Sequence, residues 1–152
     1  KKIENDRMIT GVASRDNIIF IKIKINNQDK YKSGLRVFKE LAENEVSVDF
    51  INIRTQAVSF VVEKNKRRKL LNVLEKGDYD YEISDNYVKL SLVGGGMTGR
   101  PGVMARIVES LNQKGISIFQ TTDSHTTISC LIKSKDEKRA LNTLHKAFKL
   151  SG

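Results

Sequence analysis

The sequence has little cysteine, little proline, no tryptophan and no long hydrophobic run. Cys130 is the only cysteine, so a disulfide within the chain is excluded and a reducing, cytoplasmic location is expected. No apolar stretch reaches the roughly 20 residues that a membrane-spanning helix needs. No charged-then-apolar signal segment opens the chain either. These absences predict a soluble, cytoplasmic protein without a membrane partner.

Acidic residues are also in deficit, with 18 against 27 lysines and arginines, which gives a net charge of +9. A surface for nucleic acid is one interpretation of this charge, and scattered solvated lysines are the other. The only dense basic cluster is Lys64–Lys69, and it has no interleaved aromatic residues on which bases could stack. We therefore predict no nucleic-acid partner.

Histidine is scarce as well, and neither His125 nor His145 stands in a spacing typical of a metal site. His125 lies near Asp123 in a predicted hairpin turn, and His145 lies on a predicted helix as a surface or half-buried residue. Cys130 alternates inward on a predicted strand, as a small core residue does. No nucleophile–base pair is evident. The sequence thus predicts no catalytic residue, no metal and no cofactor within these 152 residues.

The most informative stretch is VKLSLVGGGMTGRPGVMARIVESLNQKGISIFQ, which begins at Val88. It predicts a strand at Val88–Val93, a glycine-rich turn, and a helix at Pro101–Lys114, in whose first turn proline loses no hydrogen bond. Gly115 is expected to end this helix in a left-handed conformation. The turn matches GxGxxG, but the strand after the helix runs straight into a hairpin. That context argues against a dinucleotide-binding fold.

Apolar alternation and helical spacing predict the remaining elements. The first half has an apolar segment at Met8–Ser14 and strands at Ile18–Ile25, Val46–Ile53, Ala57–Glu63 and Tyr79–Ser84. A loop is predicted at Asn26–Gly34, followed by a helix at Leu35–Glu43. A second helix is predicted from Asn65, its N-cap, to Glu75, and Gly77 ends it. The second half continues with strands at Ile116–Thr122 and Thr126–Lys133, and with a helix to Phe148 that starts at a capping box, Ser134 to Glu137.

The two halves form an internal repeat. A shift of 70 residues aligns Val37 with Ile107 and Leu74 with Leu144, and it keeps the order helix, strand, strand, helix without a gap. Each unit is therefore predicted to be a ferredoxin-like βαββαβ domain of the α+β class. Its two helices should cover one face of a four-stranded antiparallel sheet, and the other face needs cover or a partner.

The second unit lacks a fourth strand, because the equivalent of Tyr79–Ser84 would fall beyond Gly152. Met8–Ser14 is apolar and has no place in the first unit. We infer that Met8–Ser14 completes the second sheet. The first unit (15–86) is then an insertion in the second (8–14 plus 87–152), and residues 1–7 form a linker. The chain does not begin with methionine, so we expect it to belong to a longer protein.

The helix that follows the glycine turn offers free N–H groups and a partial positive charge, and the glycines let a ligand approach the backbone. An amino-acid carboxylate suits such a site, and its ammonium could be taken by backbone carbonyls and nearby acids. The equivalent place in the first unit has Asp29, Ser33 and Gly34 in the loop and Asp49 in the next strand. The alternative is that both loops are only tight connections, since glycine also serves plain turn geometry.

Two βαββαβ units with a Pro-Gly turn before a helix resemble the ACT domain. The segments MITGVAS, VSVDFINI and VGGGMTGRPGVMARIVESLNQKGISIFQTTDSHTTISCLI, with the closing ALNTLHKAF, are similar to the C-terminal regulatory region of aspartate kinase. The similarity covers nearly all of the chain. The segment DSHTTI most resembles the Firmicute type of aspartate kinase, which meso-diaminopimelate inhibits, rather than the types that threonine or lysine inhibits.

The resemblance implies a non-catalytic, amino-acid-sensing fragment, which gives feedback inhibition by lysine, threonine or meso-diaminopimelate. The kinase domain, which phosphorylates aspartate with ATP and Mg, would be a partner from the same protein. A free-standing ACT-type ligand-binding or dimerisation module of another enzyme or regulator is the alternative. The resemblance also implies a homodimer through the ACT domains, with effectors in the interface.

Carried over by position, the resemblance implies two sets of effector-binding residues. The first loop departs from the family, because Tyr31-Lys32 stands where Pro-Gly is frequent. The second-unit residues would be Met97, Thr98, Gly99, Pro101, Gly102, Val103, Ile118 and Gln120, and the first-unit residues Asp29, Ser33, Gly34, Leu35, Asp49 and Phe50.

Overall fold

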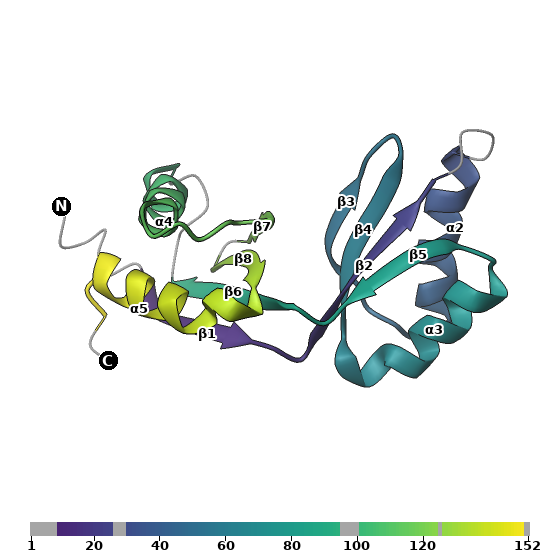
Figure 1. The fold of residues 1–152 in the computed structure, drawn as a ribbon, viewed down its shortest axis with the longest axis horizontal. Coiled ribbons are helices and arrows are strands. Elements are labelled where there is room, and N and C mark those ends of the chain that lie inside the picture. Colours follow the sequence, from purple (N-terminus) through teal and green to yellow (C-terminus); the bar gives the residue numbers. More distant parts are fainter. Residues whose placement is uncertain (1–8, 26–29, 95–100, 125, 151–152) are drawn as a thin grey trace. The chain divides into compact units, whose positions relative to one another are not determined.

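The computed structural model of the chain describes residues 9–25, 30–94, 101–124 and 126–150, and every statement below concerns these residues. They form two compact units (Figure 1). The first unit runs from Asn17 to Asn86, and the second consists of the chain up to Asp16 together with the chain from Tyr87 onward. The predicted linker, 1–7, lies outside the described residues.

The first unit is a four-stranded antiparallel sheet in the order β3-β4-β2-β5. Its strands are β2 (Ile18–Lys24), β3 (Asp49–Ile53), β4 (Ala57–Glu63) and β5 (Asp80–Ser84). Its helices are α2 (Lys30–Glu43) and α3 (Arg67–Lys76), the latter preceded by the 3-10 turn η1 (Lys64–Lys66).

The second unit has the same plan, with the sheet order β1-β6-β8-β7. Its elements are β1 (Ile9–Arg15), β6 (Tyr87–Gly94), α4 (Pro101–Gln113), β7 (Gln120–Asp123), β8 (Thr127–Lys133), the 3-10 turn η2 (Ser134–Asp136) and α5 (Glu137–Ala147). Strand β1 pairs with β6 and so takes the place that β5 has in the first unit. This confirms that the N-terminal strand completes the second sheet and that one unit is inserted in the other.

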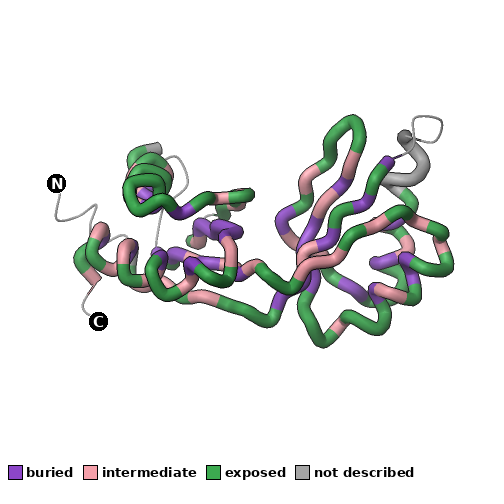
Figure 2. The backbone as a smooth tube through the Cα atoms, viewed as in Figure 1, coloured by how far each residue is buried: buried purple, intermediate pink, exposed green. Residues whose placement is uncertain are grey.

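Each sheet buries one face against its own two helices. In the first unit, Ile19, Ile21 and Ile23 of β2 pack with Val37 and Leu41 of α2, and with residues of α3. The second unit repeats this arrangement with apolar residues of β6 and β8 against α4 and α5. Figure 2 shows the resulting alternation of buried and exposed residues along the strands. Cys130 is fully buried in the second core, as the alternation predicts.

The predicted starts of α3 and α5 are wrong. Asn65 and Ser134 lie in 3-10 turns, and the α-helices begin at Arg67 and Glu137, without a side-chain capping bond at either N-cap. Glu137 does not complete a capping box, because its carboxylate accepts a hydrogen bond from Ser14 Oγ at 2.5 Å. A tertiary contact between β1 and α5 thus takes the place of the local one.

The strands after α2 and α4 begin later than the sequence predicts, at Asp49 and Gln120 instead of Val46 and Ile116. Val46 and Ile116 are buried, but their N–H groups bind the carbonyls of Leu41 and Leu111 and close the preceding helices. Gly115 between them is left-handed (φ 70°), as predicted. Helix α2 begins at Lys30, so the predicted loop at Asn26–Gly34 is wrong in its last five residues.

Two arginines 70 residues apart tie the helices of each unit together. Arg36 of α2 donates to the carbonyl of Gly77 (2.9 Å), and Arg106 of α4 donates to the carbonyl of Ala147. Each guanidinium also lies 4.8 Å from the centre of an aromatic ring, Tyr79 or Phe148. Both contacts place a positive charge at the C-terminus of a helix, where the helix dipole favours it.

We expect Arg106→Ala to lower the free energy of unfolding of the second unit by about 1–2 kcal/mol, since a charge-assisted, partly buried hydrogen bond is lost. Arg36→Ala should cost less, about 0.5–1 kcal/mol, because its contacts are exposed to solvent. Urea denaturation measures both values. Lys39→Ala, at an exposed position of α2, is the control. An equal loss of stability in the control would contradict a stabilising role for the two arginine contacts.

Candidate effector site

The helix-start half of the site in the second unit is the first turn of α4. Pro101 is the first residue of this helix, and Gly102 follows it on the surface. A Cβ added to Gly102 would meet no atom within 4 Å in the described chain outside its own helix. Val103 is buried and anchors the turn to the core. The first N–H groups of a helix have no partner within it, so this open turn can bind an anion. Met97, Thr98 and Gly99 lie outside the described residues.

The strand half of the second-unit site lies at the start of β7. Ile118 is half-buried against the core, and Gln120 is the first residue of β7, opposite Leu131 of β8. Gln120 is therefore the residue of this half that combines a polar side chain with partial exposure.

The first-unit residues lie partly where the sequence predicts them. Ser33 and Gly34 belong to α2 rather than to the loop predicted before it, whereas Leu35 lies in α2 as predicted. Asp29 lies outside the described residues. Asp49 begins β3, and its Oδ1 accepts a hydrogen bond from the Phe50 N–H at 2.8 Å. Phe50 is almost fully buried, so its side chain cannot line an open site.

The strand register separates the two halves within each unit. Gln120 lies level with Lys89, since both are opposite Leu131, whereas α4 follows the other end of β6 at Gly94. The five residue steps from Lys89 to Gly94 span roughly 17 Å. In the first unit Asp49 lies level with Phe20, and α2 follows the far end of the same strand, β2. A single amino acid is too short to span this length of strand.

Edge strand β3 carries apolar residues that the sequence analysis did not single out. Ile51 and Ile53 are 49% and 62% exposed, whereas Thr121 and Asp123, the corresponding residues of edge strand β7, are polar. The signal in the sequence is the adjacent pair Phe50-Ile51, which breaks the alternation of a regular strand.

A second unpredicted cluster lies around Lys133 of β8. Its ammonium is 4.4 Å from the centre of the Tyr87 ring and 3.3 Å from the Tyr87 hydroxyl, and Phe119 packs edge-on against Tyr87.

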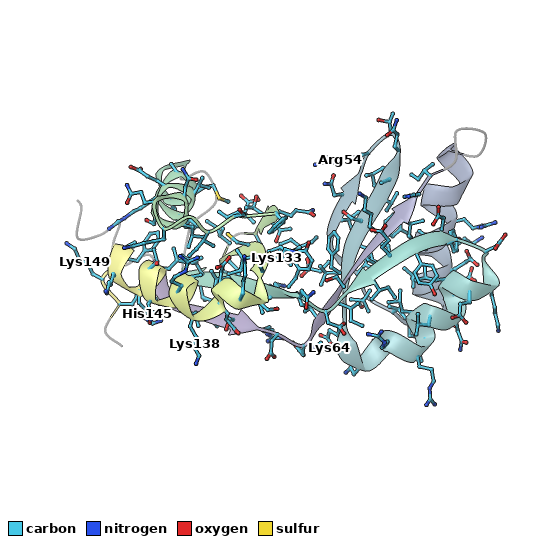
Figure 3. The ribbon with its side chains drawn as sticks, viewed as in Figure 1. Arg54, Lys64, Lys133, Lys138, His145 and Lys149 are labelled. Carbon is cyan, nitrogen blue, oxygen red and sulfur yellow. The ribbon has the colours of Figure 1, made fainter. Side chains whose placement is uncertain are left out.

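The basic residues labelled in Figure 3 come from several elements rather than from one stripe, including Lys64 of η1 and Lys138 of α5.

The titratable groups indicate structural roles. Burial raises the pKa of the Cys130 thiol to about 12, so the thiol is not a nucleophile at neutral pH. Burial also raises the pKa of Tyr79, whose hydroxyl donates to Glu40, and this pair stabilises the contact of α2 with the chain after α3. His145 is half-buried on α5, as predicted, and His125 lies outside the described residues.

In the described ranges, no three metal-ligating side chains gather into a possible metal site. Among the same residues, no helix has the length and apolar character needed to cross a membrane.

Comparison with known proteins agrees with the fold. Residues 82–146 match the family model of the ACT domain. The chain is 38% identical over 148 residues to aspartokinase 1 of Bacillus subtilis, and this alignment covers 96% of the chain and 36% of that protein. The regulatory subunit of aspartate kinase from Thermus thermophilus superimposes with a TM-score of 0.83 at 28% identity, over 94% of this chain and 99% of that one.

A structure of aspartokinase alpha and beta subunits gives the same TM-score of 0.83 at 29% identity, over 93% of this chain and 99% of that one. The chain spans about a third of the length of the curated relatives that it matches, from 36% to 38% for three of them. What it shares with these enzymes is their C-terminal regulatory part.

Proposed function

Because this chain is a tandem ACT-domain region related to the regulatory part of aspartokinases, we propose that it senses an amino acid and gives feedback control of an aspartate-phosphorylating kinase domain. Its likeness to a regulatory subunit over 99% of that subunit's length carries the proposal. The candidate effectors are lysine, threonine and meso-diaminopimelate, the kinase domain would bind ATP and Mg, and the location would be cytoplasmic. The effector acts allosterically, so its affinity must differ between the two states of the assembly.

The separation of the two half-sites supports a site completed by a second copy of the chain. If two copies join along β3 in antiparallel fashion, the start of β3 in one copy meets the end of β3 in the other. That end lies on the side of the sheet where α2 begins, as the register of β2 with β4 requires. The same reasoning applies to β7 and α4. A homodimer can thus bring a helix-start half and a strand half together.

The effector is tested by titration calorimetry of the chain with lysine, threonine and meso-diaminopimelate, with molecular mass measured in parallel. We expect one of them to bind. Gly102→Ala should abolish or strongly weaken this binding, by tenfold or more, because a Cβ would occupy the space in which a carboxylate approaches the helix N–H groups. The same change should leave stability unchanged or raise it by up to about 1 kcal/mol, since alanine favours helix over glycine.

Gly11→Ala is the matched control, because a Cβ there is equally free of neighbours in the described chain and lies on β1, outside the predicted site. Equal binding by the Gly102→Ala variant and the natural chain would remove the first turn of α4 from the site. If none of the three amino acids bound at millimolar concentration while the dimer was intact, effector sensing would be refuted. That result would favour a free-standing dimerisation module.

The homodimer is tested at Ile53, which is 62% exposed on the edge strand β3. An exposed apolar edge strand is a template for pairing with another chain, and a charge on it opposes that pairing. We expect Ile53→Lys to convert the dimer to a monomer by light scattering, with circular dichroism unchanged. Val108→Lys, at a 43% exposed apolar residue of α4, is the control and should stay dimeric. If the Ile53→Lys variant were still a dimer, β3 would be excluded as the dimer interface.

A further inference from the structure

The described residues include five with left-handed backbone, and four of these recur between the units. Glu45 and Gly115, 70 residues apart, close α2 and α4, and Asp78 and Lys149, 71 apart, follow the ends of α3 and α5. These four belong to the helix ends that both units need. Phe50 (φ 51°) is the fifth, and neither Phe119 nor Gln120, which align with Asp49 and Phe50, is left-handed. The shared fold therefore does not require the conformation of Phe50.

This conformation is unfavourable for a bulky residue. Left-handed backbone is disfavoured about 5- to 30-fold for residues other than glycine, and the apolar side chain of phenylalanine, unlike that of asparagine or aspartate, cannot offset this cost by a local hydrogen bond. The Phe50 side chain is 1% exposed, so burial of the ring offsets the cost. Such strain persists only where the surroundings fix it, and it is concentrated at functional sites.

The strain coincides with an irregularity in the edge strand. Asp49 lies opposite Val61 and Asn52 opposite Ser59, so β3 has one more residue than β4 across this interval. The Phe50 N–H binds the Asp49 carboxylate at 2.8 Å. A bulge of this kind redirects the neighbouring backbone and side chains. The bulge lies between the paired residues Asp49 and Asn52, so Phe50 and Ile51 form it. The resemblance places Phe50 and the preceding Asp49 in the first-unit effector site.

We propose that Phe50 is a positioning residue for the first-unit effector site, whose left-handed backbone holds the start of β3 in the shape that the effector binds. The proposal rests on the proposed effector-sensing function and deepens it. The ring does not touch the effector, because it is buried; it acts by fixing the backbone at Asp49.

Two substitutions separate the backbone from the ring. Phe50→Ala and Phe50→Gly both remove the ring, but only glycine adopts left-handed backbone without a penalty. In the alanine variant residue 50 should relax to an extended conformation. Effector binding must then restore the strained form, so affinity should fall about 5- to 30-fold. In the glycine variant affinity should return to within about threefold of the natural chain, although both variants are less stable.

Calorimetry with lysine, threonine and meso-diaminopimelate measures the affinities, and backbone chemical shifts of residue 50 report its conformation. Equal affinities in the two variants, or an alanine that stays left-handed, would overturn the proposal and leave the effector-sensing function intact. If the natural chain bound none of the three amino acids, the effector-sensing function would be refuted, and the positioning role of Phe50 would be refuted as well. If the alanine variant does not fold by circular dichroism, Phe50→Leu takes its place, because leucine keeps an apolar side chain and the same left-handed penalty.

Discussion

A chain that begins at Asp16, and therefore lacks β1, is expected to lose the folded second unit and to keep the first. Six residues of β1 are paired with β6, and an antiparallel ladder makes about one hydrogen bond per pair. At about 0.5–1.5 kcal/mol each, this ladder contributes roughly 3–9 kcal/mol. Val12 also packs against the second core, and Ser14 binds Glu137. The loss is comparable to the entire stability of a small domain, about 5–15 kcal/mol.

Hydrogen exchange distinguishes the two units in this experiment. Amides of β6 and β8 should lose their protection, while amides of β2 and β4 keep theirs, because β1 pairs with β6 and the first sheet is complete without it. A chain that begins at Ile9 is the matched control, since it retains β1. Loss of protection in β2 and β4 would mean that the first unit depends on β1, contrary to the strand order.

The repeat made the sheets and the place of β1 predictable, because both depend on apolar side chains. The cores use residues at equivalent positions, such as Leu41 and Leu111, and a sheet with three strands needs a fourth. Helix starts were less predictable. Ser134 and Glu137 have the spacing of a capping box, but Glu137 binds Ser14, which is 123 residues away. No local pattern can show a competitor that only the fold brings close.

The candidate site was predictable only in part, for a related reason. The sequence showed that Gly102 and Gln120 belong to one unit, but their separation depends on the register of β6, β7 and β8. The bulge at Phe50 was equally hidden, since left-handed backbone at a buried phenylalanine opposes its local preference. If the site is shared between two copies, as we propose, it also leaves no pattern within one chain, because each copy would supply half.

The two cores should respond separately to cavity-forming substitutions. Leu74 of α3 and Leu144 of α5 are 70 residues apart, and both are fully buried, each in a different core. Leucine to alanine at such a position removes buried methyl groups and leaves a cavity, which costs about 2–5 kcal/mol. Leu74→Ala should therefore destabilise the first unit by this amount, and Leu144→Ala should destabilise the second.

Leu71→Ala and Leu141→Ala are the matched controls, since these leucines lie on the same two helices but are half-buried, so each change should cost less. Hydrogen exchange of β4 and β8 reports the two units individually. Since the two cores share no residue, each substitution should lower protection in only one sheet, and the double variant should show the sum of the single effects. If Leu144→Ala lowered protection in β4 as much as in β8, the units would unfold as one. The proposed effector would then act on a single cooperative body instead of on two separable domains.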